Sequence, residues 1–72
     1  MYEKIVIGGI YQHFKGNKYK VLNIAKHSET LEEIVVYQAL YGKEDVWVRP
    51  INMFLEDIER DGKIIKRFKF IK

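Results

Sequence analysis

Polar and aromatic side chains that can bind a ligand recur along this chain. They combine histidine, arginine, carboxylate and hydroxyl groups with aromatic rings, and they are Tyr11, His13, His27, Glu29, Thr30, Tyr37, Trp47, Arg49 and Arg67. An aromatic ring stacks on a planar group, and a guanidinium binds phosphate or carboxylate through two parallel hydrogen bonds. The residue types therefore predict a groove for a small planar anion, a nucleotide or a related molecule.

Strand alternation places two pairs of these residues. Side chains two apart on an extended chain point to the same face, so Tyr11 and His13 share one face and Trp47 and Arg49 share another. If the two faces adjoin, an aromatic wall meets a guanidinium. This is the arrangement that the predicted groove requires.

Structural roles compete with binding at several of these positions. Arg49 would pair with Glu29 and hold the loop of residues 27–33. The side chains of Tyr37 and Trp47 would pack in the hydrophobic core. The residue types leave these alternatives open.

The His27 to Thr30 stretch allows two interpretations. Together with His13, the side chains of His27 and Glu29 would offer two nitrogens and a carboxylate to a metal, but the spacing is not that of a helical metal motif. In a simple turn, the Ser28 and Thr30 hydroxyls would accept from backbone amides and Glu29 from His27. We favour the turn and predict no metal and no cofactor.

Catalysis has little support in the sequence. His27 as base and Glu29 as its orienting group would need a nucleophile facing them, and sequence neighbours such as Ser28 rarely do so. The chain has no glycine-rich phosphate loop and no nucleophile elbow. The sequence leaves an enzyme open and favours a non-catalytic binding protein.

Composition predicts one small all-β domain spanning residues 1–72. Sixteen valines and isoleucines stand against two alanines, an excess that favours strands over helices. No apolar run is long enough to cross a membrane, and no signal-peptide pattern begins the chain. The sequence has no cysteine, so we expect a reducing cytoplasm.

The expected elements are short strands between turn residues. We predict strands at 10–15, 19–26, 34–41 and 46–49, with a turn at Gly16-Asn17.

The segment after Pro50 has both helical and alternating character. We predict one helical turn over residues 50–54, then a hairpin of residues 56–60 and 63–70 around Asp61-Gly62. Residues 1–7 form an N-terminal extension or an extra strand.

Charge and apolar surface suggest partners. The net charge is +3, and both ends of the chain are basic. Single-stranded RNA or DNA is therefore an alternative ligand. In that case the aromatic rings would stack on bases and the terminal lysines would bind phosphates. The strands at 19–26 and 34–41 carry more apolar surface than so small a barrel can enclose, which predicts a homodimer. A peptide-binding or assembly module is a further alternative.

A series of motifs resembles a family of short, mainly bacterial proteins known only as a domain of unknown function. The match covers about residues 8–70, and only Lys66 departs, where the family has proline. The resemblance implies a small SH3-like five-stranded β-barrel and no established activity. The motifs are Gly9-x-Tyr11-x-His13-Phe14-Lys15-Gly16, His27-Ser28-Glu29-Thr30, Val36-Tyr37-x-Ala39-Leu40-Tyr41-Gly42, Trp47-Val48-Arg49-Pro50, Met53-Phe54 and Asp61-Gly62-Lys63 before Arg67-Phe68.

Overall fold

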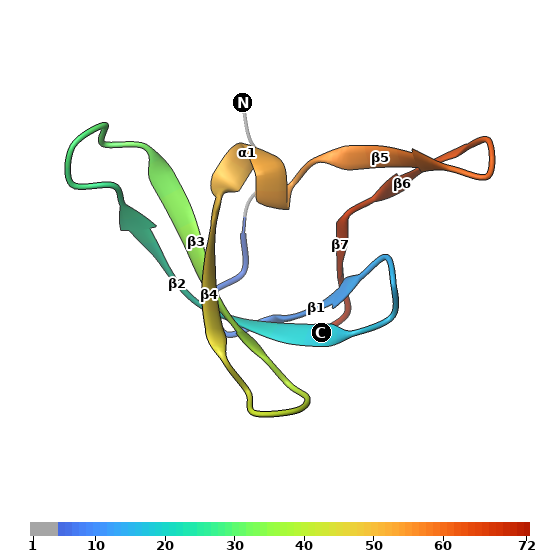
Figure 1. Ribbon diagram of the computed structural model, residues 1–72, viewed down its shortest axis with the longest axis horizontal. Coiled ribbons are helices and arrows are strands. Elements are labelled where there is room, and N and C mark those ends of the chain that lie inside the picture. Colours follow the sequence, from blue (N-terminus) through green and yellow to red (C-terminus); the bar gives the residue numbers. More distant parts are fainter. Residues whose placement is uncertain (1–4) are drawn as a thin grey trace.

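The structure, a computed structural model, describes residues 5–72 and is mostly β with one short helix (Figure 1). Five strands form one sheet in the order β4-β3-β2-β1-β7, and β5 pairs with β6 in a separate hairpin. Every pairing is antiparallel. The elements are β1 (Ile10–His13), β2 (Lys18–Lys26), β3 (Glu33–Ala39), β4 (Val46–Pro50), α1 (Ile51–Phe54), β5 (Asp57–Arg60), β6 (Lys63–Lys66) and β7 (Phe68–Phe70).

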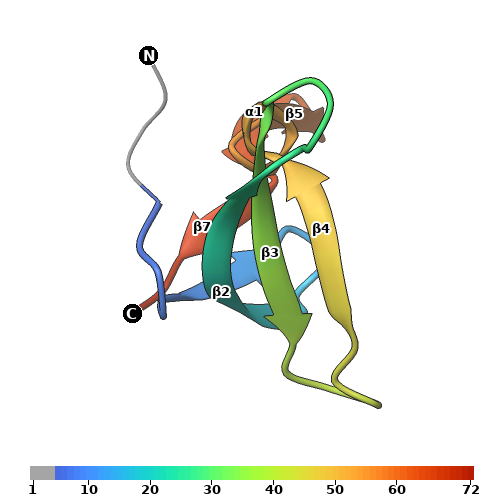
Figure 2. The ribbon, with the colours of Figure 1, turned by 90° about the vertical axis from the view of Figure 1, so that its left-hand side faces the viewer.

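The core lies against one face of the five-stranded sheet. Strand alternation directs every second side chain inward, and α1 adds two residues from above the sheet (Figures 1 and 2). Phe54, Val21 and Val35 are fully buried. The core cluster consists of Ile5, Tyr11, Val21, Val35, Tyr37, Ile51, Phe54 and Phe68.

The predicted helical turn after Pro50 is confirmed. It buries Ile51 and Phe54 and ends at Phe54, because β5 begins three residues later. The predicted hairpin turn is also present, with Asp61 at φ 54° and Gly62 at φ 76°. Two consecutive left-handed residues form the tight turn that matches the twist of a two-stranded ribbon.

Most predicted strands have other bounds, and the one predicted at 34–41 spans Glu33–Ala39. The first ends at His13 rather than residue 15, because Gly16 N–H bonds the His13 carbonyl at 2.7 Å and closes a turn before the predicted Gly16-Asn17 site. The predicted strand at 63–70 is broken at Arg67. There the chain leaves β5, and Phe68 pairs with His13 of β1. The departure occurs although Lys66 replaces the family's proline.

The N-terminal prediction is only partly testable, since residues 1–4 lie outside the described residues. Residues 5–7 form no strand, and Ile5 is buried in the core. Over the described chain the hydrogen-bonded sheet does not close on itself, so the SH3-like barrel stays a prediction. None of the described residues belongs to a helix long and apolar enough to span a bilayer.

Gly9 provides a stability test of this packing. A Cβ at this position would lie 2.9 Å from Phe70 Cε1 and 3.0 Å from the Val6 carbonyl oxygen. We expect Gly9→Ala to lower the free energy of unfolding by about 1–3 kcal/mol, as overpacking does. Gly62→Ala has open space and only backbone strain, so we expect it to cost about 1 kcal/mol. Urea unfolding measures both, and a Gly9→Ala variant as stable as the unmodified chain would contradict the steric explanation.

Candidate functional site

The sheet register brings the two predicted faces onto one surface. Trp47 is opposite Tyr37, and His13 is opposite Phe68. Opposed residues on antiparallel strands point to the same side. The inner face therefore carries Tyr11 and His13 from β1 together with Trp47 and Arg49 from β4.

Phe68 is the ring around which the basic groups gather. Arg49 Cζ lies 5.7 Å from its centroid, and the His13 ring centre lies 5.0 Å away in an edge contact. Phe68 is itself 3% exposed, and its ring stacks on that of Phe54 at 4.2 Å. A guanidinium and an imidazole thus meet at one aromatic surface.

Arg49 is held by Tyr37 and not by Glu29. Its Nε donates to the Tyr37 hydroxyl at 3.3 Å, and it forms no ion pair with any described residue. The alternative in which Arg49 holds the loop of residues 27–33 is therefore wrong. No carboxylate of residues 5–72 is paired with the positive charge of Arg49.

Tyr37 and Trp47 have different surroundings although they are cross-strand partners. Tyr37 is 5% exposed and contacts Phe54 and Phe68 edge-on, so core packing describes it correctly. Trp47 is 52% exposed, and the packing alternative is wrong for it within a single chain. Its ring remains available beside Arg49.

Arg67 joins the cluster from the segment between β6 and β7. One of its terminal nitrogens pairs with Glu56 at 3.4 Å, and its backbone N–H bonds the Glu56 carbonyl at 2.9 Å. Its Nε is buried and has no hydrogen-bond partner among residues 5–72. A buried unsatisfied donor is costly, and an added acceptor would satisfy it.

The pKa of His13 reflects the burial and the charges around it. Burial lowers its pKa from the ordinary 6.5, and the charges of Arg49, Arg67 and Lys15 lower it further. The Lys15 N–H donates to His13 Nδ1 at 3.2 Å, so the neutral ring carries its proton on Nε2. At pH 7 His13 is therefore neutral and offers Nε2–H as a donor.

Two tyrosines belong to this face that sequence reasoning did not select. The hydroxyls of Tyr19 and Tyr41 are 2.7 Å apart. Burial and this hydrogen bond raise the pKa of Tyr19 to about 12. Tyr19 also meets the rings of His13 and Tyr37 edge-on. The register of β2 sets the placement of Tyr19, which is opposite Tyr11 of β1 and Ala39 of β3.

Tyr11 has a structural role on the same face. It is 4% exposed, contacts Phe54 and Phe70, and its hydroxyl accepts from the Val6 N–H at 3.0 Å. This hydroxyl is engaged in fastening the segment before β1. Tyr11 thus contributes to the site mainly by supporting it.

His27, Glu29 and Thr30 form a turn away from the cluster. They lie in the loop between β2 and β3, at the opposite end of β2 from the β1–β2 turn (Figure 1). His27 Nδ1 accepts from the N–H groups of Glu29 and Thr30, at 3.1 and 3.4 Å, and Thr30 Oγ1 accepts from Glu32 N–H. The residues form a turn and Thr30 accepts as expected, but His27 accepts from the Glu29 backbone instead of donating to the Glu29 carboxylate, and the turn does not bring these residues to Arg49. No three histidine or acidic side chains within residues 5–72 form a metal-binding group.

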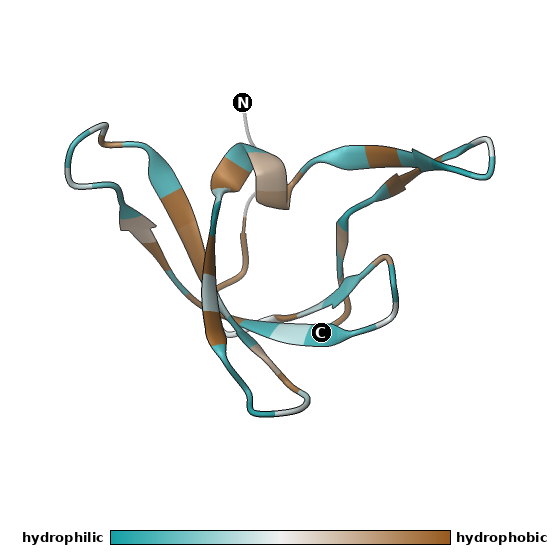
Figure 3. Cartoon of the chain, viewed as in Figure 1, coloured by the Kyte–Doolittle hydropathy of each residue, from teal (hydrophilic) through white to brown (hydrophobic). Residues whose placement is uncertain are grey.

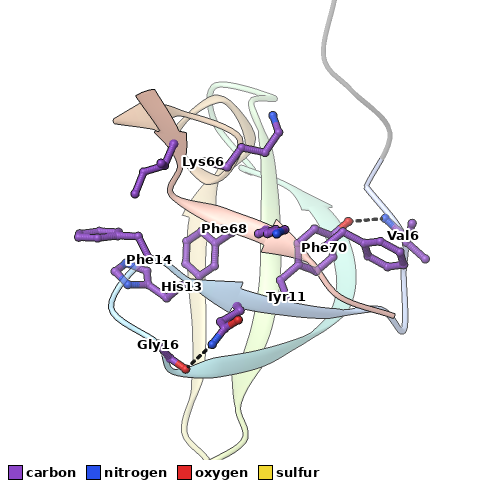
Figure 4. A pocket seen from close by; sticks show the side chains of 11 residues that line it. Val6, Tyr11, His13, Phe14, Gly16, Lys66, Phe68 and Phe70 are labelled. Atoms are coloured by element: carbon purple, nitrogen blue, oxygen red, sulfur yellow. Dashed lines mark hydrogen bonds between the residues drawn. The ribbon is translucent and has the colours of Figure 1, made fainter. Parts of the chain in front are cut away.

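A cleft of about 790 Å³ adjoins the cluster along β1 and β7 (Figure 4). It shares His13 and Phe68 with the cluster, and Phe14 and Phe70 extend its aromatic wall. Lys66 and Lys69 add positive charge to its lining. Aromatic surface and basic groups therefore continue beyond the inner face.

These features define a mostly β domain with a basic, aromatic face, and comparison with known proteins gives its family. The chain belongs to the family described as "Protein of unknown function (DUF1653)", whose model matches residues 9–70. It is similar to a protein of that family from Bordetella bronchiseptica, known from a crystal structure. The identity is 30%, the match covers 89% of this chain and 85% of that chain, and the TM-score is 0.81. Curated proteins give no match. The expected membership in a family of unknown function is confirmed.

The pKa of His13 tests whether the cluster is assembled as described. Arg49→Gln removes a nearby positive charge, so we expect the His13 pKa to rise toward 6.5. Proton NMR titration of the imidazole measures it. Lys20→Gln is the control, since Lys20 is opposite Gln38 on the other side of the sheet and should leave the pKa unchanged. A pKa that does not respond to Arg49→Gln would show that the two groups are apart in solution.

Proposed function

We propose that the protein is a non-catalytic domain that binds a planar anionic ligand, a nucleotide or a related small molecule. The observation that carries the proposal is the meeting of Arg49 and His13 at the ring of Phe68, with Arg67 close enough to His13 for its charge to lower the pKa of that imidazole. Within residues 5–72, only Glu56 is paired with a cation of this group, through its contact with Arg67. An anion would compensate the remaining charge and accept from the buried Arg67 Nε.

An anion in this position would also change the protonation of His13. A negative charge stabilises imidazolium, so binding should raise the pKa of His13 and take up a proton. The affinity of the site should therefore increase as the pH falls below neutrality. The proton would remain on His13 while the ligand is bound.

Trp47 supplies the surface for the planar part of the ligand. Its ring is half exposed on the same face as Arg49, and its cross-strand neighbour on β3 is the buried Tyr37. Stacking on such a ring contributes about 1–3 kcal/mol per base in nucleic-acid complexes. A ligand with a ring and an acidic group would use both features together.

The framework of the proposal is an SH3-like barrel that is partly open. Two features support a barrel of this kind: β7 pairs with β1, and a helical turn connects β4 to the last strands. Nucleotides and related anions are abundant in the cytoplasm, which is where we propose that the protein acts.

Arg49 is the residue that tests the binding proposal. We expect adenosine and guanosine monophosphate to raise the melting temperature, and adenosine alone to have a smaller effect. Arg49→Lys keeps the charge but loses the planar fork, so affinity should fall by about 1–3 kcal/mol. Isothermal titration calorimetry measures the loss.

Lys20→Gln is the matched control for Arg49→Lys, because it alters a charge on the opposite face and should leave affinity unchanged. If folded protein binds neither nucleotide at millimolar concentration, the proposal is wrong. An equal loss of affinity in Arg49→Lys and Lys20→Gln would point to general electrostatic attraction rather than to binding at the cluster.

Single-stranded nucleic acid is the second candidate, and Phe14 favours it. Lys15 Nζ lies 5.9 Å and Arg60 Cζ 5.2 Å from the Phe14 ring centre, so two cations accompany this ring. Lys66 and Lys69 line the adjoining cleft. A strand could stack bases on this wall while the cations hold its phosphates.

Salt dependence separates the two candidates. If several lysines and arginines bind phosphates, affinity for a fluorescent single-stranded RNA should fall steeply between about 50 and 200 mM salt. One small anion should lose far less over that range. Phe14→Ala should weaken RNA binding and spare nucleotide binding at Arg49. RNA affinity that is insensitive to both salt and Phe14→Ala would exclude the nucleic-acid candidate.

A further inference from the structure

The outer edge of β4 is apolar and has no neighbour among the described residues. The sheet ends at β4, as Figure 2 shows. Val46, Trp47 and Val48 are consecutive and are 53%, 52% and 64% exposed. Hydrophobic colour marks this strand in Figure 3. Edges of this kind pair with another strand unless charge, a bulge or proline prevents it.

The hydrogen-bond pattern shows which backbone groups of β4 are directed away from β3. Ala39 N–H donates to the Asp45 carbonyl at 2.9 Å, so residues 39 and 45 form a hydrogen-bonded pair. Such pairs alternate along an antiparallel ladder. The backbone groups of Trp47 and Arg49 therefore face β3, and those of Val46 and Val48 face outward. Pro50 offers a carbonyl but no N–H.

We propose that this edge pairs with β4 of a second copy of the chain, antiparallel and centred on Trp47. In that register Val46 faces the partner's Val48, and Val48 faces the partner's Val46. Each pair exchanges two hydrogen bonds, so every outward N–H and carbonyl of these two residues is satisfied. The two sheets then continue into each other.

The side chains are complementary in the same register. Trp47 meets the partner's Trp47 across the twofold axis, while the valines pair on the other face. Arg49 faces the partner's Asp45, which places opposite charges together. A parallel, in-register pairing would instead set Arg49 against the partner's Arg49, so charge favours the antiparallel arrangement.

Pro50 disfavours the pairing that is shifted by one residue and centred on Val48. If the pairing were centred on Val48, Val46 would face the partner's Pro50. The missing N–H of that proline would leave the Val46 carbonyl unpaired at the interface. The register centred on Trp47 has no such defect, and it joins the two inner faces side by side.

Disulfide trapping tests the register, and it is independent of any ligand. The chain has no cysteine, so Val46→Cys and Val48→Cys each carry a single thiol. In the proposed pairing the Cα atoms of residues 46 and 48 of opposite chains are about 5.5 Å apart, which a disulfide can span. A mixture of the two variants should cross-link under mild oxidation, and neither should do so alone. Cross-linking of Val48→Cys by itself would overturn the register.

Sedimentation equilibrium tests the association itself. We expect the unmodified chain to be dimeric at high micromolar concentration, and Val48→Lys to be monomeric with an unchanged circular dichroism spectrum. Ile64→Lys is the control, because Ile64 is equally exposed, at 69%, but lies on β6 of the separate hairpin, and it should leave the dimer intact. A monomeric unmodified chain, or equal dissociation in both variants, would overturn the proposal. Because this pairing engages Trp47 and Arg49, the dimer and a nucleotide would compete for these two side chains, and nucleotide binding by a monomer would leave the proposed function standing.

Discussion

The contact between Phe68 and Phe54 organises both the core and the candidate site. The two rings stack at 4.2 Å, one from the last strand and the other from the helical turn. Phe68 reaches this place because β7 pairs with β1 and sets Phe68 opposite His13. Packing of this ring therefore determines where its outer surface meets Arg49. Aromatic pairs of this kind add about 0.5–1.5 kcal/mol beyond the area they bury.

The site follows from the smallness of the domain. Almost every inward side chain is needed for the core, so the polar groups occur where strands end and aromatic rings become partly exposed. Arg49 is directly before Pro50, and Arg67 occupies the break between β6 and β7. The backbone at the end of a strand is held rigidly, while a side chain there lies at the edge of the core. Because the domain is small, Trp47 and its neighbouring valines also remain exposed at an open edge of the sheet.

Local patterns were sufficient for most elements of this chain, although not for the bounds of its strands. Alternation identified the inward residues of β3, and Pro50 together with Asp61-Gly62 marked the helical turn and the hairpin. The break at Arg67 was not predictable, because apolar residues continue through it and proline is absent. Tertiary pairing with β1 outweighs the local continuity of that segment.

The sequence by itself determined which side chains share a face of each strand, since alternation is a local property of extended backbone. It also determined that residues 27–30 favour a turn. Only the tertiary structure decided that the faces of β1 and β4 adjoin, that Arg49 binds Tyr37 rather than Glu29, and that His27 lies apart. Those outcomes depend on strand order and register, and these are set by contacts between residues that are far apart in the chain.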